Sequence, residues 1–96
     1  MITKGRRQSH HACSLAGDKS GVTLDIYSEL CALQVYDGSG LAKLAGKDGA
    51  TYGPYAGIAL ETQFSPDAIH HPAFSQPICT PDRPFQRRVI YAFGVA

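Results

Sequence analysis

Several features that mark particular classes of protein are absent from this sequence. Its 96 residues leave room for one small domain and exclude a two-domain enzyme. No apolar run approaches the ~20 residues of a membrane span, and residues 1–7 lack the apolar stretch that follows the charges of a secretory signal. We therefore expect a soluble, cytoplasmic protein that does not bind membranes.

A strong charge of either sign is also missing. Nine Lys and Arg against eight Asp and Glu give a formal net charge of +1, which is too small for the positive field that nucleic-acid binding needs. We expect no nucleic-acid partner. Hydrophobic residues make up 44% of the chain and charged residues 18%, and this composition favours a globular core over disorder.

Cysteine and histidine are few and do not form a recognised metal or redox motif. Cys13, Cys31 and Cys79 are odd in number and widely spaced, so we interpret them as reduced, buried thiols. The His pairs at 10–11 and 70–71 raise the question of a metal site. Adjacent strand residues point to opposite faces and no acid or Cys completes a ligand set, so surface or turn histidines are favoured and no metal or cofactor is expected.

The periodicity that is present is that of β-strands. Apolar and polar residues alternate over 22–27 and 30–36, and we expect these two segments to pair as a hairpin. The patterns predict further strands over 57–63 and 85–95, and an earlier one over about 7–15 before a turn at 16–21. The fold class predicted is all-β with antiparallel strands.

Two long segments are predicted to be irregular. Between 37 and 57 lie six of the ten glycines, with only 41–45 able to form a helical turn. Between 66 and 84 lie five of the six prolines, which lack the backbone donor that regular structure needs. Long loops of this kind are often functional.

Two predicted strands each carry a face of small, polar or aromatic residues. One presents Ala32, Gln34 and Tyr36, and the other presents Ala59, Glu61 and Gln63. Small residues leave space for a ligand, while amides, carboxylates and Tyr bind and stack on sugars, so this side suits a carbohydrate. A solvated outer face explains the alternation equally well.

Glu61 is the acid that stands out. It ends the run 56–61, whose other residues are apolar or small, and partial desolvation on a central strand would make a carboxylate a better base. A structural ion pair with Arg87 or Arg88 is the alternative.

The sequence resembles the aldose 1-epimerase family. The resemblance rests on the run 57–72, GIALETQFSPDAIHHP, and continues through 24–27, 33–38 and 91–93. It extends from about Gln8 onward and matches the C-terminal third of a complete member. The resemblance implies that residues 1–96 are a single partial domain, the C-terminal portion of a galactose mutarotase-like antiparallel β-sandwich.

The resemblance also implies an activity and roles for two residues. The family is an isomerase that interconverts α and β anomers of aldohexoses such as galactose and glucose without a cofactor. Glu61 takes the place of the general base, and Gln34 resembles a ligand of the sugar hydroxyls. The family's acid is an upstream histidine, and none of the four histidines here has a matching context. His70 stands where the family commonly has Asn. We expect this chain alone to be inactive or very weak.

A non-catalytic carbohydrate-binding or assembly module is the alternative function. A piece of a larger β-sandwich exposes strand edges and an uncovered sheet face, so self-association is expected in either case.

Overall fold

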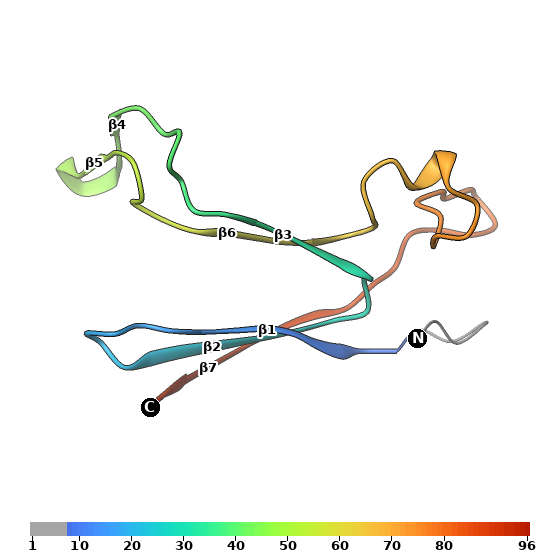
Figure 1. The fold of residues 1–96 in the computed structure, drawn as a ribbon, viewed down its shortest axis with the longest axis horizontal. Coiled ribbons are helices and arrows are strands. Elements are labelled where there is room, and N and C mark those ends of the chain that lie inside the picture. Colours follow the sequence, from blue (N-terminus) through green and yellow to red (C-terminus); the bar gives the residue numbers. More distant parts are fainter. Residues whose placement is uncertain (1–7) are drawn as a thin grey trace.

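The computed structural model describes residues 8–96, which form an all-β fold of three small antiparallel sheets (Figure 1). This confirms the predicted fold class. The strands are β1 (His10–Ala16), β2 (Val22–Ser28), β3 (Ala32–Tyr36), β4 (Leu44–Ala45), β5 (Thr51–Tyr52), β6 (Ala59–Gln63) and β7 (Val89–Val95). The two 3₁₀ turns are η1 (Lys47–Gly49) and η2 (Ala68–His70). No helix in the described part of the chain is long and apolar enough to cross a membrane.

The first sheet contains three strands in the order β1-β2-β7. A tight turn joins β1 to β2, with Gly17 N–H donating to Val22 O at 2.8 Å and Gly21 N–H donating to Gly17 O at 3.0 Å. Gly21 has a φ of 73°, which glycine adopts at little cost. The predicted strand before the turn at 16–21 is therefore present, although it begins at His10.

The predicted hairpin between the second and third strands is wrong. β2 pairs with β1 on one side and with β7 on the other, so neither edge remains for β3. Ser28 Oγ accepts a hydrogen bond from Leu30 N–H at 2.9 Å, and this buried turn directs the chain out of the first sheet. β3 then pairs with β6 in a second sheet.

The glycine-rich segment 37–57 is more regular than its composition suggests. In place of a helical turn at 41–45, β4 and β5 pair as a short hairpin around η1. The two ends of this segment are joined at Gly38. Its carbonyl accepts hydrogen bonds from Leu41 N–H at 3.1 Å and from Tyr55 N–H at 3.2 Å.

The proline-rich segment 66–84 is irregular as predicted, apart from η2 and one isolated bridge between Thr80 and Arg83. The last strand is shorter than predicted, because regular pairing begins at Val89 and not at residue 85. Phe85 instead contacts Phe64 edge to face, with ring centroids 6.3 Å apart.

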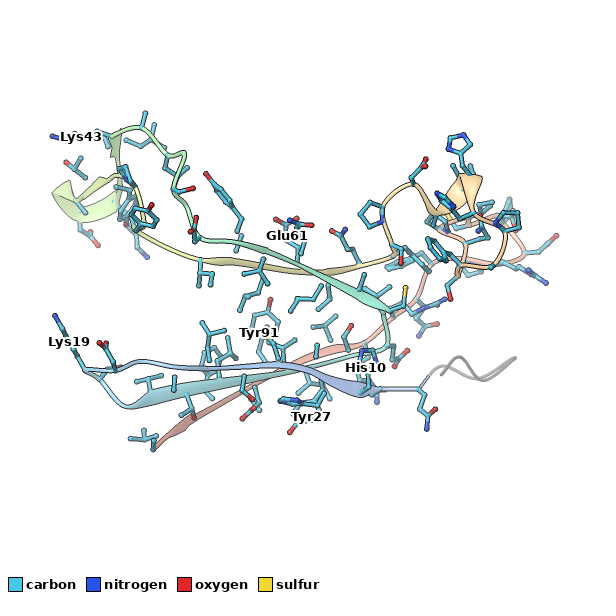
Figure 2. The ribbon with its side chains drawn as sticks, viewed as in Figure 1. His10, Lys19, Tyr27, Lys43, Glu61 and Tyr91 are labelled. Atoms are coloured by element: carbon cyan, nitrogen blue, oxygen red, sulfur yellow. The ribbon has the colours of Figure 1, made fainter. Side chains whose placement is uncertain are left out.

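The two larger sheets lie one above the other (Figure 1). Tyr91 rises from the first sheet toward the second (Figure 2) and its hydroxyl donates to Leu60 O at 3.4 Å. Ile26, the register partner of Tyr91, is fully buried in this layer. In residues 8–96 the other buried hydrophobic residues are Leu30 and Ala68, so the core is small.

The cysteines are free thiols, but their predicted burial is wrong for two of the three. Cys13 is half-buried, whereas Cys31 and Cys79 are exposed. An apolar neighbour in sequence does not bury a thiol that lies at the end of a turn or in the proline-rich loop.

Candidate functional site

The site candidate is the face of the β3-β6 sheet that carries Gln34 and Glu61. Antiparallel pairing places Ala32 opposite Gln63, Gln34 opposite Glu61, and Tyr36 opposite Ala59. Side chains alternate between the two faces of a sheet, so these six residues share one face. The two polar segments that the sequence singled out separately are thus brought together.

This polar face points away from the rest of the molecule. Glu61 projects from the side of the β3-β6 sheet that faces away from the β1-β2-β7 sheet (Figure 2). The opposite face carries Leu33, Val35 and Leu60, and Leu60 is the residue whose carbonyl Tyr91 reaches. The apolar side of the sheet therefore covers the core and the polar side is open.

Gln34 and Glu61 are direct cross-strand neighbours. Cβ atoms of such pairs lie about 4.5–5.5 Å apart, so an amide and a carboxylate stand side by side, and both side chains are exposed. An amide can donate to and accept from a hydroxyl group, while a carboxylate accepts a proton. The pair has the functional groups needed to hold one hydroxyl and deprotonate its neighbour.

Tyr36 extends this face toward the loop that follows β3. Its hydroxyl accepts a hydrogen bond from Gly40 N–H at 2.8 Å, which fixes the ring against the loop. Ala32 and Ala59 are the small residues of the face and are half-buried. Each end of the face therefore pairs an alanine with a larger residue, and the Gln34–Glu61 pair lies between the two ends.

The setting of Glu61 differs from one sequence expectation. Within residues 8–96, β6 pairs with β3 alone, so the strand is not central and its carboxylate is exposed rather than desolvated. Glu61 forms no ion pair with Arg87 or Arg88 in the described part of the chain. Arg87 instead lies over the rings of Phe64 and Phe85, 5.7 and 5.9 Å from their centroids.

Two polar clusters lie outside this face and were not foreseen from the sequence. On the first sheet, Ser14 donates to Asp25 Oδ1, and His11 Nε2 lies 2.9 Å from the same oxygen. These hydrogen bonds hold the pKa of the Asp25 carboxyl below its ordinary value. The bond from Ser14 has the larger effect and the bond to His11 the next largest. The cluster depends on the β1-β2 register, which periodicity alone does not give.

The second cluster follows β6 in the proline-rich segment. Asp67 contacts His70 Nδ1 at 2.5 Å through one carboxylate oxygen and His71 Nε2 at 3.3 Å through the other. The spacing of three and four residues was a usable signal, because η2 places such residues on one side of a turn. Residues 8–96 contain no group of three or more His, Cys, Asp or Glu arranged to hold a metal ion.

His11 does not complete the Gln34–Glu61 pair on this chain. His11 packs edge to face on Tyr27, with ring centroids 5.2 Å apart, and Tyr27 projects from the side of the first sheet opposite to the β3-β6 layer (Figure 2). His11 and Glu61 therefore lie on opposite outer sides of the molecule. A cavity of about 640 Å³ lies elsewhere, between Phe64, Cys79, Arg83 and Phe85, and neither Gln34 nor Glu61 lines it.

The fold and this face define a class: a two-layer antiparallel β protein with an amide and a carboxylate paired on an open sheet face. Comparison with known proteins then identifies the family. Residues 3–92 match the model of the aldose 1-epimerase family, and the chain belongs to that family.

Relatives in animals and bacteria agree with this assignment. The chain is 33% identical over 94 residues to the galactose mutarotase of Homo sapiens, which is 97% of this chain and 28% of the human protein. It is 41% identical over 61 residues to the aldose 1-epimerase of Haemophilus influenzae, covering 62% of this chain and 18% of that protein. It is 35% identical over 75 residues to the Escherichia coli aldose 1-epimerase, covering 78% of this chain and 21% of that protein. The chain thus spans between about a fifth and just over a quarter of their lengths.

Proposed function

We propose that this chain is the C-terminal part of an aldose 1-epimerase that interconverts the α and β anomers of aldohexoses such as galactose and glucose. The observation that supports the proposal most is the pairing of Gln34 with Glu61 on one open sheet face of a chain that belongs to this family. Glu61 is the general base and Gln34 binds a sugar hydroxyl.

The chemistry assigned to Glu61 is proton removal from the hydroxyl on C1. As the carboxylate takes that proton, the bond between C1 and the ring oxygen breaks and an acid protonates the ring oxygen. This leaves an open-chain aldehyde. Rotation about C1–C2 exposes the other face of the aldehyde, and the reverse proton transfers close the ring to either anomer. Both protons are returned, so the cycle needs no cofactor.

The two exposed side chains divide the work in this mechanism. The carboxylate of Glu61 has no ion-pair partner within residues 8–96, so it can accept a proton without first breaking a contact. The amide of Gln34 stands beside it at the same register position and holds a hydroxyl of the sugar ring. Tyr36 offers an aromatic surface for the apolar face of a sugar.

This chain supplies the base but not the acid. Removal of one member of an acid and base pair typically lowers the rate by roughly 10²–10⁴-fold, so the chain alone is expected to leave mutarotation close to the rate in buffer. The acid and further sugar ligands come from a preceding part of the complete fold.

Polarimetry of freshly dissolved α-galactose tests the proposal. The 96-residue chain would be measured alone and joined behind the part of the E. coli aldose 1-epimerase that precedes its match to this chain. The joined protein should accelerate mutarotation and the chain alone should not. If the joined protein folds cooperatively and binds galactose but leaves the buffer rate unchanged, the chain is a non-catalytic carbohydrate-binding module.

A further inference from the structure

The outer edge of β7 is an unpaired strand edge with unusual properties. β7 pairs with β2 on one side only in the described residues. From Val89 to Val95 it contains no charged residue and no proline, and all seven residues are exposed. Natural proteins usually protect an edge with charge, proline or a bulge, and this edge has none of the three.

The other edge of the same sheet is protected. The register of β1 against β2 shifts between His11 and Cys13, which is the mark of a β-bulge, and a bulge bends an edge away from further pairing. The edges of the second sheet are shorter and carry Glu61. β7 is therefore the edge best suited to pair with another strand.

The backbone groups of β7 that face outward can be identified. Ala96 N–H donates to Gly21 O at 2.7 Å and Glu29 N–H donates to Arg88 O at 3.1 Å, so the even-numbered residues here bond to the β2 side. Backbone groups alternate along an antiparallel strand. The N–H and C=O groups that point to the free edge are therefore those of Val89, Tyr91, Phe93 and Val95.

These four residues are symmetric about Ala92. In an antiparallel pair centred on Ala92, Val89 stands opposite Val95 of a second copy and Tyr91 stands opposite Phe93. Each of these pairs joins two residues whose backbone groups both face the free edge, so each can exchange both hydrogen bonds. Aromatic cross-strand pairs add further stability, and Phe93 and Val95 are 71% and 80% exposed in the single chain.

The charges beside β7 favour this arrangement over a parallel one. Arg87 and Arg88 come directly before the strand. A parallel pair would place the two Arg88 side chains opposite one another, and like charges in that position are destabilising. In the antiparallel pair centred on Ala92, the two Arg88 residues are at opposite ends, about 27 Å apart at ~3.4 Å per residue.

We propose that two copies of this chain associate through antiparallel pairing of β7 with β7, centred on Ala92. The two three-stranded sheets then become one six-stranded sheet in the order β1-β2-β7-β7-β2-β1. The inward-facing Tyr91 and Phe93 of the two copies meet on the same face, beneath the β3-β6 layers.

Size-exclusion chromatography with light scattering over a range of protein concentrations gives the first test. The chain should pass from the mass of one copy to that of two as its concentration rises. Phe93→Lys places a charge against Tyr91 of the second copy, and Val95→Pro removes an outward N–H without removing a bond to β2. Both should shift the dissociation constant upward by at least 10-fold. Tyr55→Lys is the matched control, because Tyr55 is an aromatic loop residue that is 70% exposed, close to the 71% of Phe93. The Tyr55→Lys variant should dimerise like the unmodified chain.

Amide hydrogen exchange supplies a second readout that does not depend on variants. The outward amides of Tyr91 and Phe93 should be protected only at concentrations where the dimer forms, whereas Ala92, bonded toward β2, should be protected at all concentrations. The proposal is overturned if the chain stays monomeric throughout, or if both β7 variants dimerise like the unmodified chain. If the Tyr91 and Phe93 amides are protected only in the joined protein described above, the free edge of β7 pairs with the preceding segment and not with a second copy. That result would also overturn the proposal.

Discussion

At the scale of single residues, the sequence identified the polar face but not its surroundings. Alternation alone put Gln34 on one strand face and Glu61 on another, and the observed register makes them direct neighbours. The sequence also suggested a desolvated Glu61, which the exposed, singly paired β6 does not provide. Desolvation depends on what covers a strand, and local pattern does not determine that.

Asp25 gives a residue-scale prediction that concerns stability. Ser14 and His11 lower the pKa of its carboxyl from the ordinary 3.8, so the ionised form stabilises the folded chain above that pH. This contribution is lost as the pH falls through the lower folded value. Asp25→Asn should therefore melt below the unmodified chain at pH 5, and the gap between the two should narrow as the pH is lowered below 3.8.

Thermal melts followed by circular dichroism at pH 5 and at several values below 3.8 measure this gap. Asp37→Asn is a suitable control, because Asp37 accepts only a local hydrogen bond from Ser39 N–H and lies outside the sheets. A gap for Asp25→Asn that stays constant down to the lowest pH would contradict the assignment of the stabilising contacts to the ionised carboxylate.

At the scale of elements, strand existence was predictable and strand partnership was not. The segments that became β2, β3, β6 and β7 all showed period-two alternation. The hairpin expected between β2 and β3 failed because β7, more than 60 residues further along the chain, occupies the edge of β2. Alternation reports that a strand has two different faces, but it carries no information about which distant strand lies beside it.

Gly38 gives the prediction at this scale, because it closes the loop after β3. Its φ is 78°, and an added Cβ would lie 2.9 Å from the carbonyl oxygen of Gly57. Gly49 has a similar φ of 74° but nothing within 4 Å of its added Cβ. Gly49→Ala should cost the ~1 kcal/mol of a left-handed alanine, and Gly38→Ala should cost more because the backbone must also move.

Melting temperatures separate the two effects. About 1 kcal/mol corresponds to roughly 4–8 °C in a domain of this size. The melting temperature of Gly49→Ala should therefore drop by an amount in that range, and that of Gly38→Ala should drop by more. Equal melting temperatures for the two variants would show that the contact with Gly57 contributes nothing.

At the scale of the whole molecule, two sheet layers enclose a small core, and the outer face of the β3-β6 layer is polar and open. Large hydrophobic residues of β7 are exposed, and the relatives are more than three times as long as the matched segment. Composition predicted a globular core, whereas the buried hydrophobic residues within residues 8–96 are Ile26, Leu30 and Ala68 alone. The size of the core could not be predicted, because it depends on how many strands share it.

The central claim is that Glu61 is the base of a sugar-binding face. Gln34→Ala offers the contrasting behaviour, because the loss of a hydroxyl ligand should raise KM for galactose with a smaller effect on kcat. Glu29→Gln is the matched control for charge, since Glu29 lies in the turn between the two sheets.

The most direct measurement is kcat for mutarotation by the joined protein carrying Glu61→Gln. The substitution keeps the volume of the side chain and removes only its ability to accept a proton. We predict a loss of roughly 10²-fold or more in kcat with a smaller change in KM, while Glu29→Gln retains normal turnover. A Glu61→Gln protein with near-normal kcat would contradict the assignment of Glu61 as the general base.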